Sequence, residues 1–195
     1  MTAAALKIPP EPIWPISVAR YHKMIATGVL TSDDQVELLE GWILPKMPKN
    51  PAHVFAVETL IELLLRLNLA GYVIRSQNPL TTTDSEPEPD VCVVRGTRKD
   101  YLKHHPRPKD AALVIEVAES SIARDRGLKK RIYAKALTPI YWIVNLLERQ
   151  IEVYSEPARS KGEYRLSRIF KAGENVALNL DGREVAQIAV SEVVP

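Results

Sequence analysis

Apolar positions along the chain follow a helical period in three segments. The longest covers residues 52–69 and predicts a long helix. Ser17 is a suitable N-cap for a shorter helix that stops at Gly28. The third segment predicts a helix over residues 121–137. Thr138-Pro139 ends this helix, because proline disfavours helical geometry in the residue before it. The N-terminal half and the middle of the chain therefore each contribute helices.

Short apolar runs predict strands between these helices. Residues 72–77, 90–94 and 112–117 form such runs. The last two, DVCVV and ALVIEV, lack alternation, as expected for central strands covered on both faces. The Glu40-Gly41 pair predicts a hairpin turn, IYWIVN and QIEVYSEP a second hairpin, and the C-terminal tail two or three shorter strands. This order predicts a mixed α/β (α+β) fold: a mixed sheet flanked by helices, with an N-terminal helix and hairpin extension.

Composition narrows the class of protein. At 195 residues, 46% hydrophobic and 26% charged, one domain over 1–195 is expected, with 1–16 as a proline-rich extended arm. A net charge of +2 does not by itself imply nucleic-acid binding. One cysteine excludes an internal disulfide, no leader pattern precedes the first helix, and no apolar run could cross a membrane. A cytoplasmic protein without membrane contact is expected.

Two acids stand at the predicted central strands. Asp90 opens one strand directly after the turn-forming EPEP, and Glu116 lies near the end of the next, inside an apolar run. A buried carboxylate needs a partner or a metal to offset its lost hydration. Neighbouring strands can bring both carboxylates to one site, where Mg²⁺ would remove their repulsion. The pattern therefore favours a divalent-metal site.

A lysine on the following predicted helix completes this set. Lys129 lies at i,i+4 spacing from Asp125 and from Tyr133, so the three share one helix face. A lysine beside a metal can orient or deprotonate a water and stabilise phosphate charge. The ordered set of strand acid, strand acid and helix lysine is more specific than either acid alone.

These residues resemble a known family. EPEPDVCVV, LVIEVAESSIARDRGLKKRIYAKA and PIYWIVNLLERQIEVYSEP are similar to the bacterial family of putative restriction endonuclease-like proteins, a domain of unknown function within the PD-(D/E)XK nuclease superfamily. The resemblance covers nearly the whole chain. It implies a restriction endonuclease-like fold with a nuclease core at 52–145, and a metal-dependent phosphodiesterase site with catalytic Asp90, Glu116 and a lysine.

The position of the lysine departs from the superfamily's usual spacing. That spacing would place it two residues after Glu116, where this sequence has Ala118. By resemblance the lysine has moved to the next helix, which indicates Lys129 rather than Lys130. Asn145 stands where such proteins more often have aspartate, a departure beyond the expected site.

The resulting hypothesis is a Mg²⁺ (or Mn²⁺) dependent DNA endonuclease. Asp90, Glu116 and the backbone carbonyl of Val117 are expected to hold the metal, and Lys129 to position the attacking water. DNA is the expected partner. Because two strands need two active sites, cutting of a duplex would favour a homodimer.

Simpler interpretations of these residues remain open at this stage. Asp90 could be a polar residue at a strand start on the surface, and Glu116 could pair with a buried cation and serve structure alone. Asp125 and Lys129 could form an exposed helix salt bridge worth ~0.3–0.5 kcal/mol. These readings predict that Asp90, Asp125 and Lys129 are exposed.

Four residues are accessory candidates for the site. They are Glu37, His53, Gln77 and Asp125. For Glu37, as for Glu40 and Glu58, surface charge is the simpler reading, and for His53 an ordinary hydrogen bond. The His104-His105 pair lacks a second ligand pair at zinc spacing, so no zinc site is expected.

Two basic segments follow the strands that carry the acids. RGTRKDYLKHHPRPK at 95–109 and RDRGLKKR at 124–131 are expected beside the cleft, where they would grip phosphates without reading bases. Solvated surface is the equally simple alternative.

Two other functions are consistent with the sequence. A catalytically inactive nucleic-acid-binding or assembly module could keep this fold and act with a partner. A sugar hydrolase could use Asp90 and Glu116 as an acid/base pair, although the helix lysine would then be unexplained.

Overall fold

The structure is a computed structural model that describes residues 14–195. Most of the predicted extended arm therefore lies outside the described residues. The elements in chain order are α1 (Val18–Ala26), β1 (Val36–Leu39), β2 (Trp42–Pro45), α2 (Pro51–Arg66), β3 (Tyr72–Arg75), β4 (Val91–Arg95), η1 (Arg98–Tyr101), η2 (Pro108–Asp110), β5 (Ala111–Ala118), α3 (Ile122–Arg124), η3 (Asp125–Lys129), α4 (Lys130–Lys135), β6 (Ile140–Asn145), β7 (Gln150–Ala158), β8 (Glu163–Lys171), β9 (Asn175–Leu180), β10 (Arg183–Ala189) and α5 (Val190–Val193).

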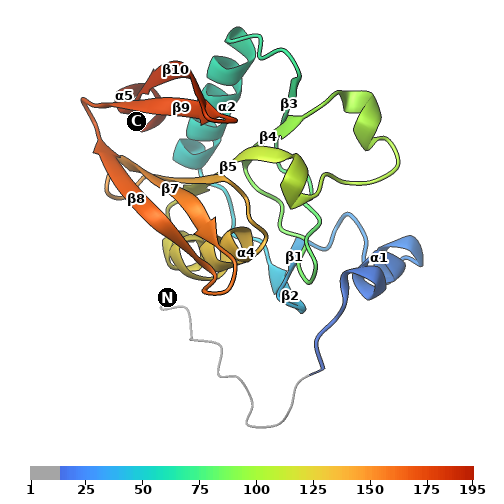
Figure 1. Cartoon of the computed structure of the whole chain (residues 1–195). Helices are drawn as coiled ribbons and strands as arrows, with labels where there is room; N and C mark the ends of the chain where they lie inside the picture. Colours follow the sequence, from blue (N-terminus) through green and yellow to red (C-terminus); the bar gives the residue numbers. More distant parts are fainter. Residues whose placement is uncertain (1–13) are drawn as a thin grey trace.

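A six-stranded mixed sheet forms the centre of the protein (Figure 1). Its strand order is β3-β4-β5-β6-β7-β8. Only the β5–β6 pair of this sheet is parallel, because the α3-η3-α4 helical segment crosses between those strands. The predicted mixed sheet flanked by helices is confirmed.

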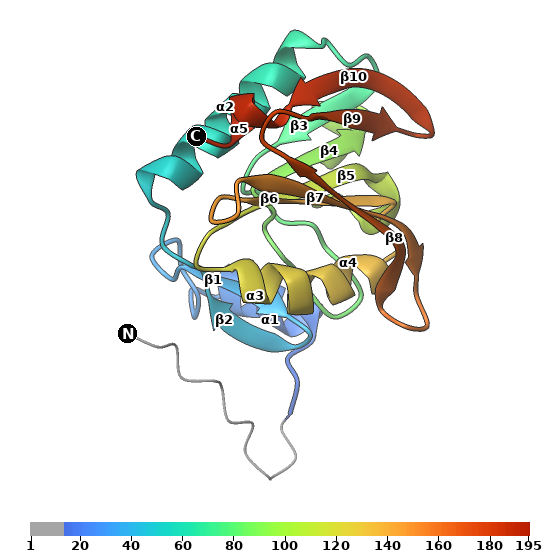
Figure 2. The same cartoon turned by 90° about the vertical axis from the view of Figure 1, so that its left-hand side faces the viewer.

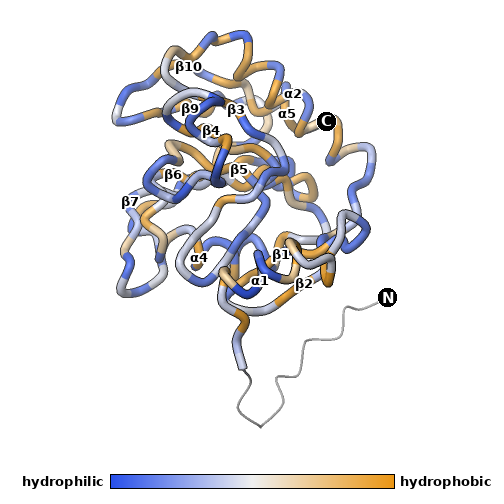
Figure 3. The backbone as a smooth tube through the Cα atoms, turned by 90° about the vertical axis from the view of Figure 1, so that its right-hand side faces the viewer, coloured by the Kyte–Doolittle hydropathy of each residue, from blue (hydrophilic) through white to orange (hydrophobic). Residues whose placement is uncertain are grey.

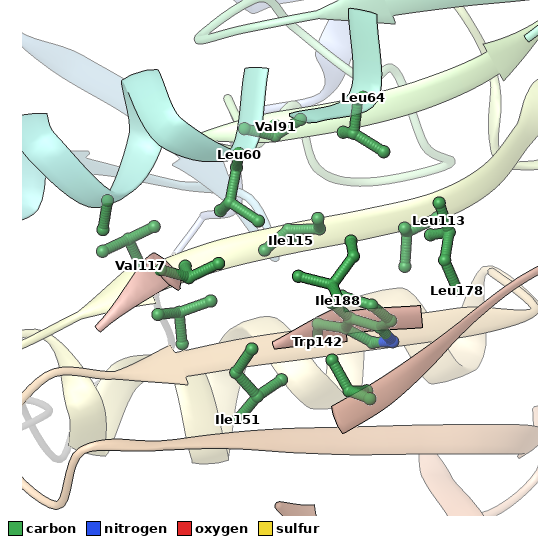
Figure 4. Packing of buried hydrophobic residues seen from close by; sticks show 14 of the residues in the cluster. Leu60, Leu64, Val91, Leu113, Ile115, Val117, Trp142, Ile151, Leu178 and Ile188 are labelled. Carbon is green, nitrogen blue, oxygen red and sulfur yellow. The ribbon is translucent and has the colours of Figure 1, made fainter. Parts of the chain in front are cut away.

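Two layers cover the sheet (Figure 2). Helix α2, α5 and the β9–β10 hairpin lie on one face, over a core that includes Leu60, Ile115 and Trp142 (Figure 4). The α3-η3-α4 segment lies on the other face, where Tyr133 and Tyr141 pack with small apolar strand residues. The apolar runs of the central strands are thus buried on both sides, as the missing alternation predicted, and hydrophilic segments lie toward the loops (Figure 3).

The β1–β2 hairpin lies on the same side of the sheet as the α3-η3-α4 segment (Figure 2). It has the tight turn predicted at Glu40-Gly41. Glu40 and Gly41 both have positive φ, 47° and 81°, as a tight hairpin turn requires. A Cβ at Gly41 would lie 2.6 Å from the Cβ of Pro15. The amide of Ile16 also donates to the Gly41 carbonyl at 2.9 Å, so the chain before α1 holds the hairpin closely.

The helices differ from the prediction in detail. Asn50 caps α2 by accepting from the His53 amide at 2.9 Å, and Pro51 takes the first turn, where a missing N–H costs nothing. The third helix is interrupted by a π turn, η3, in which the Lys130 amide donates to the Asp125 carbonyl. The helix predicted over 121–137 is therefore confirmed over residues 122–135, with a π turn in its middle that the prediction did not include. Across residues 14–195, no helix is long and apolar enough to span a membrane.

Candidate active site

The two predicted strand acids meet at one end of the sheet. Val91 pairs with Ile115, which places Asp90, just before β4, opposite Glu116 on β5. Asp90 is 8% and Glu116 3% exposed. The Asp90 Oδ2 atom accepts from the Val117 amide at 2.8 Å and lies 3.2 Å from His53 Nε2. The reading of Asp90 as a surface residue is therefore wrong.

Glu116 is held by two donors from the crossing helix. Lys129 Nζ lies 3.0 Å and the Tyr133 hydroxyl 2.7 Å from the same oxygen, Oε1. Asp125 and Lys129 are both buried, and no ion pair joins them in the described part of the chain. The interpretation of Asp125 and Lys129 as an exposed salt bridge is therefore wrong. The π turn widens the helix here and Lys129 faces the strand acid, a distortion that often marks functional sites.

The N-terminal hairpin adds an acid to this cluster. Glu37 on β1 is 3% exposed and lies 3.4 Å from Lys129 Nζ. Its carboxylate also accepts from the Glu88 amide at 3.3 Å and lies 3.8 Å from Arg124. Surface charge is therefore the wrong reading for Glu37. The ammonium of Lys129 lies between carboxylates from the sheet and from the hairpin.

These side chains open into a pocket of about 190 Å³, here called the active-site pocket. Its lining includes more carboxylates than cations. The carboxylates are Glu37, Glu88, Asp90, Glu116, Glu119 and Asp125, and the cations are Lys46, Lys49, Arg124 and Lys129. The pocket thus has an excess of negative charge.

Burial and the neighbouring charges both change the pKa values of the groups in this pocket. Burial raises the pKa of Glu116 well above its usual value; Lys129 opposes this, while Asp90, Asp125 and Glu37 raise it further. Burial also raises the pKa of Asp125. Burial lowers the pKa of Lys129, but the surrounding carboxylates raise it more, so the net shift is upward. The surrounding carboxylates therefore favour the ammonium form of Lys129.

The donor set fits a hard divalent cation. Among the described residues, no hydrogen bond is made to Glu116 Oε2 or to Asp90 Oδ1, and both side chains line the pocket. In an extended strand, the carbonyl of Val117 points to the same side as its N–H, toward Asp90. Within residues 14–195, no group of three or more His, Cys, Asp or Glu side chains could hold a metal alone. A backbone carbonyl and substrate or water oxygens would have to complete the shell, as Mg²⁺ accepts.

Some of the other predicted residues line the active-site pocket, and others lie outside it. His53 and Gln77 line the active-site pocket, and Gln77 has a positive φ of 52°. Glu40 instead accepts from Arg131 and Lys135, outside the pocket lining. Glu58 is exposed on α2.

Two polar pairs on the pocket rim were missed by the sequence interpretation. Lys46 Nζ donates to Glu88 at 2.7 Å, and the Asn50 side chain donates to Glu119. The Asn50-Pro51 start of α2 is a recognisable capping signal and could have drawn attention to Asn50. The partners of both pairs are distant in sequence, and no local pattern predicts them.

The two basic segments differ from expectation. Segment 124–131 reaches the active-site pocket through Arg124, Asp125 and Lys129, but its cations are bound to carboxylates of the protein itself. Segment 95–109 begins at the opposite end of β4 and contributes no residue to this pocket. Only segment 124–131 therefore lines the pocket beside these acids, and the contact of either segment with substrate stays a prediction.

The mixed sheet with a crossing helix and strand acids at one end defines a protein of the restriction endonuclease-like class. The chain belongs to the Uma2 family, described as putative restriction endonucleases, whose model matches residues 18–191. A crystal structure of a putative nuclease belonging to DUF820 from Anabaena variabilis has a TM-score of 0.68 and 14% identity. The match covers 92% of this chain and 97% of that one, and supports the same fold. No curated protein is significantly similar to the chain.

Proposed function

We propose that this protein is a metal-dependent nuclease that hydrolyses phosphodiester bonds in DNA. The observation that carries the proposal is the geometry of Asp90 and Glu116. These buried carboxylates stand opposite each other, each with one oxygen that accepts no hydrogen bond from residues 14–195, and a buried lysine stands beside them. Family membership supports the same class of activity.

Asp90, Glu116 and the Val117 carbonyl are the groups that would hold Mg²⁺ (or Mn²⁺). Such a cation supplies Lewis acidity and neutralises charge on the attacked phosphate. The protein holds these groups rigidly, because Asp90 is fixed by the Val117 amide and His53. On the other side, Lys129 and Tyr133 share Oε1 of Glu116, which directs Oε2 away from them.

The proposed role of Lys129 is to orient water and stabilise charge. Hydrolysis adds the oxygen of water to phosphorus, breaks one P–O ester bond and transfers a proton to the leaving oxygen. Because Lys129 remains protonated between Glu116 and Glu37, it can donate a hydrogen bond to the water or to a phosphate oxygen. Glu37 and Tyr133 are positioning residues that keep this ammonium and Glu116 in place.

The test is Mn²⁺ titration by calorimetry together with cleavage of plasmid DNA. Wild type, Asp90→Asn and Glu116→Gln are compared, with Glu58→Gln, an exposed change on α2, as the control. We expect both site variants to lose at least about 100-fold in metal affinity and to lose cleavage, since each removes a direct ligand. The control should match wild type.

The outcomes separate the competing functions. Metal-dependent cleavage that survives Asp90→Asn or Glu116→Gln would contradict the roles assigned to these residues. DNA binding by the wild type without metal uptake or cleavage would favour the inactive binding module. Hydrolysis of a sugar substrate in EDTA would favour the glycosidase reading. If both strands of a duplex are cut together, the nuclease should act as a homodimer.

A further inference from the structure

A second pocket lies between α1 and the loop that follows β4. It has a volume of about 640 Å³, and we call it the loop pocket. Its walls include His22 from α1 and Lys103, His105 and Arg107 from the loop. Glu88 lines both the loop pocket and the active-site pocket, so the two are neighbours. The loop is the segment at the right of Figure 1, above α1.

The free positive charge of the loop pocket comes from two side chains. Lys103 and Arg107 are exposed, and within the described chain neither has a carboxylate within 4.0 Å. Burial, with Arg75 and His22, lowers the pKa of His105 against the opposing effect of Glu86 and Glu88, which favours its neutral form. An anion that approaches this rim meets cations with no competing internal partner.

The acids at the floor of the loop pocket already have partners within the protein. Glu86 is buried, lies 2.7 and 2.9 Å from His22 Nε2, and accepts from the Thr81 hydroxyl at 2.9 Å. Glu88 accepts from Lys46 at 2.7 Å. Each floor carboxylate therefore has its own donor, which weakens its repulsion of an anion at the rim.

The loop is held in place before any ligand binds. Pro106 is buried, and its carbonyl accepts from the Thr81 amide at 2.9 Å. The Tyr101 hydroxyl donates to the Arg95 carbonyl, and the guanidinium of Arg75 lies 5.8 Å from the Tyr101 ring centroid. A site that is already ordered loses little entropy when it binds.

We infer that the loop pocket binds the phosphodiester backbone of the substrate strand beside the bond that is cut, with Lys103 and Arg107 on its phosphates. The inference rests on the proposed function and extends it to a second subsite. Ligand pockets usually have about 300–1,000 Å³. The active-site pocket, at about 190 Å³, is below this range and suits a single phosphate group, whereas the loop pocket can hold a nucleotide unit.

Salt-dependent binding tests this subsite. The full chain is titrated against a fluorescein-labelled single-stranded DNA oligonucleotide in EDTA, by fluorescence anisotropy over a range of salt concentrations. The variants are Lys103→Ala/Arg107→Ala and, as a matched control, Arg98→Ala/Lys99→Ala, which removes equal charge from the same loop outside the loop pocket. Cleavage in Mn²⁺ is measured in parallel.

The test pair should weaken binding about tenfold or more at low salt, because charged hydrogen bonds are lost. Its slope of log Kd against log salt should fall by about 1.4, roughly 0.7 for each phosphate contact on a single strand. The control pair should change the slope by less than half as much. Equal losses from both pairs, or no binding by the wild type, would overturn the subsite. Wild-type binding that depends on Lys103 and Arg107 without any cleavage would keep the subsite and remove the proposed nuclease function.

Discussion

The two basic segments of this protein are both rich in lysine and arginine but have different surroundings. In the helical segment around η3, each lysine and arginine from 124 to 135 is paired with a carboxylate of the chain. In the loop after β4, Arg98, Lys99, Lys103, Arg107 and Lys109 have no such partner among the described residues. Charge counted along the sequence does not distinguish these cases.

The difference teaches where substrate contacts should be sought. A cation already paired with a buried carboxylate must break that contact to bind a phosphate, at a cost that exceeds the gain at an exposed site. An unpaired cation in the loop breaks no internal contact when it binds a phosphate, and the counterions of the nucleic acid are released. The helical segment therefore holds the site together, and the loop is available for an anionic ligand. This contrast can be tested by changing one partner at a time.

The largest effect is expected at the buried pair of the candidate active site. Lys129→Met should lower cleavage by about 10²–10⁴-fold, the range for loss of a positioned proton-transfer or charge-stabilising group. It should also destabilise the fold by about 3 kcal/mol, because Glu116 loses its buried counter-charge. Cleavage rates and urea unfolding measure the two effects.

A double variant separates structure from catalysis at this pair. Lys129→Met/Glu116→Gln removes both charges and should regain part of the lost stability, since Glu116 no longer carries an unpaired charge and Glu37 keeps Arg124 at 3.8 Å. Cleavage should stay absent. A double variant that recovers cleavage along with stability would show that the pair serves structure alone.

A smaller effect is expected at Arg126, which is paired but lies outside the active-site pocket. It donates to Glu152, which is 2% exposed, at 2.6 and 3.1 Å. Arg126→Met should cost about 2 kcal/mol of stability and leave DNA binding unchanged. Urea unfolding and anisotropy measure these quantities. A loss of DNA affinity as large as that expected for Lys103→Ala/Arg107→Ala would contradict the contrast between the segments.

The Arg126 effect should depend on pH. Burial raises the pKa of Glu152, but hydrogen bonds from Arg126 and its other donors lower it more, so the net shift is downward. A carboxylate with a lowered folded pKa contributes stability above its unfolded pKa of about 4.3, and that contribution disappears as the pH falls. The difference between wild type and Arg126→Met should therefore be largest at neutral pH and shrink below about pH 4. A difference that grows in acid would exclude this pairing.

A still smaller effect is expected at the partly exposed contact between hairpin and helix, where Glu40 meets Arg131 and Lys135. The Arg131 hydrogen bond, followed by that of Lys135, lowers the pKa of Glu40 to about 2. Because solvent screens this contact, Glu40→Gln should cost only about 0.5–1 kcal/mol at neutral pH. The cost should vanish between about pH 4.3 and 2, as Glu40 itself protonates in the wild type. Chemical unfolding at neutral pH and at about pH 2 measures this cost in free energy, with Glu58→Gln as the control.

The fold could be predicted because its signals are local. The apolar run of β5, the cap and periodicity of α1 and the Glu40-Gly41 turn each depend on neighbouring residues. The meeting of Asp90 and Glu116 followed from the same information, since acids at the ends of adjacent strands share one end of the sheet. Their predicted catalytic roles stay predictions.

The rest of the site depends on contacts that are distant in sequence. The π turn that directs Lys129 toward Glu116 has no signal in the helical period of 121–137. The burial of Glu37 depends on how the hairpin packs against the crossing helix, and a short strand with acids gives no indication of that. The pairing of segment 124–131 likewise uses carboxylates from β1, β7 and β8, so its charge state is a tertiary property.

The smallest effect on stability is expected in the unpaired loop. Lys103→Ala/Arg107→Ala should change the free energy of unfolding by no more than about 0.5 kcal/mol, because exposed side chains without partners contribute little to the folded state. Urea unfolding measures it beside Arg126→Met. The two variants should then have opposite effects: Arg126→Met weakens folding and not DNA binding, and Lys103→Ala/Arg107→Ala weakens DNA binding and not folding. A loss of about 2 kcal/mol in the loop variant would mean that its cations have a structural role, and the contrast between the two segments would fail.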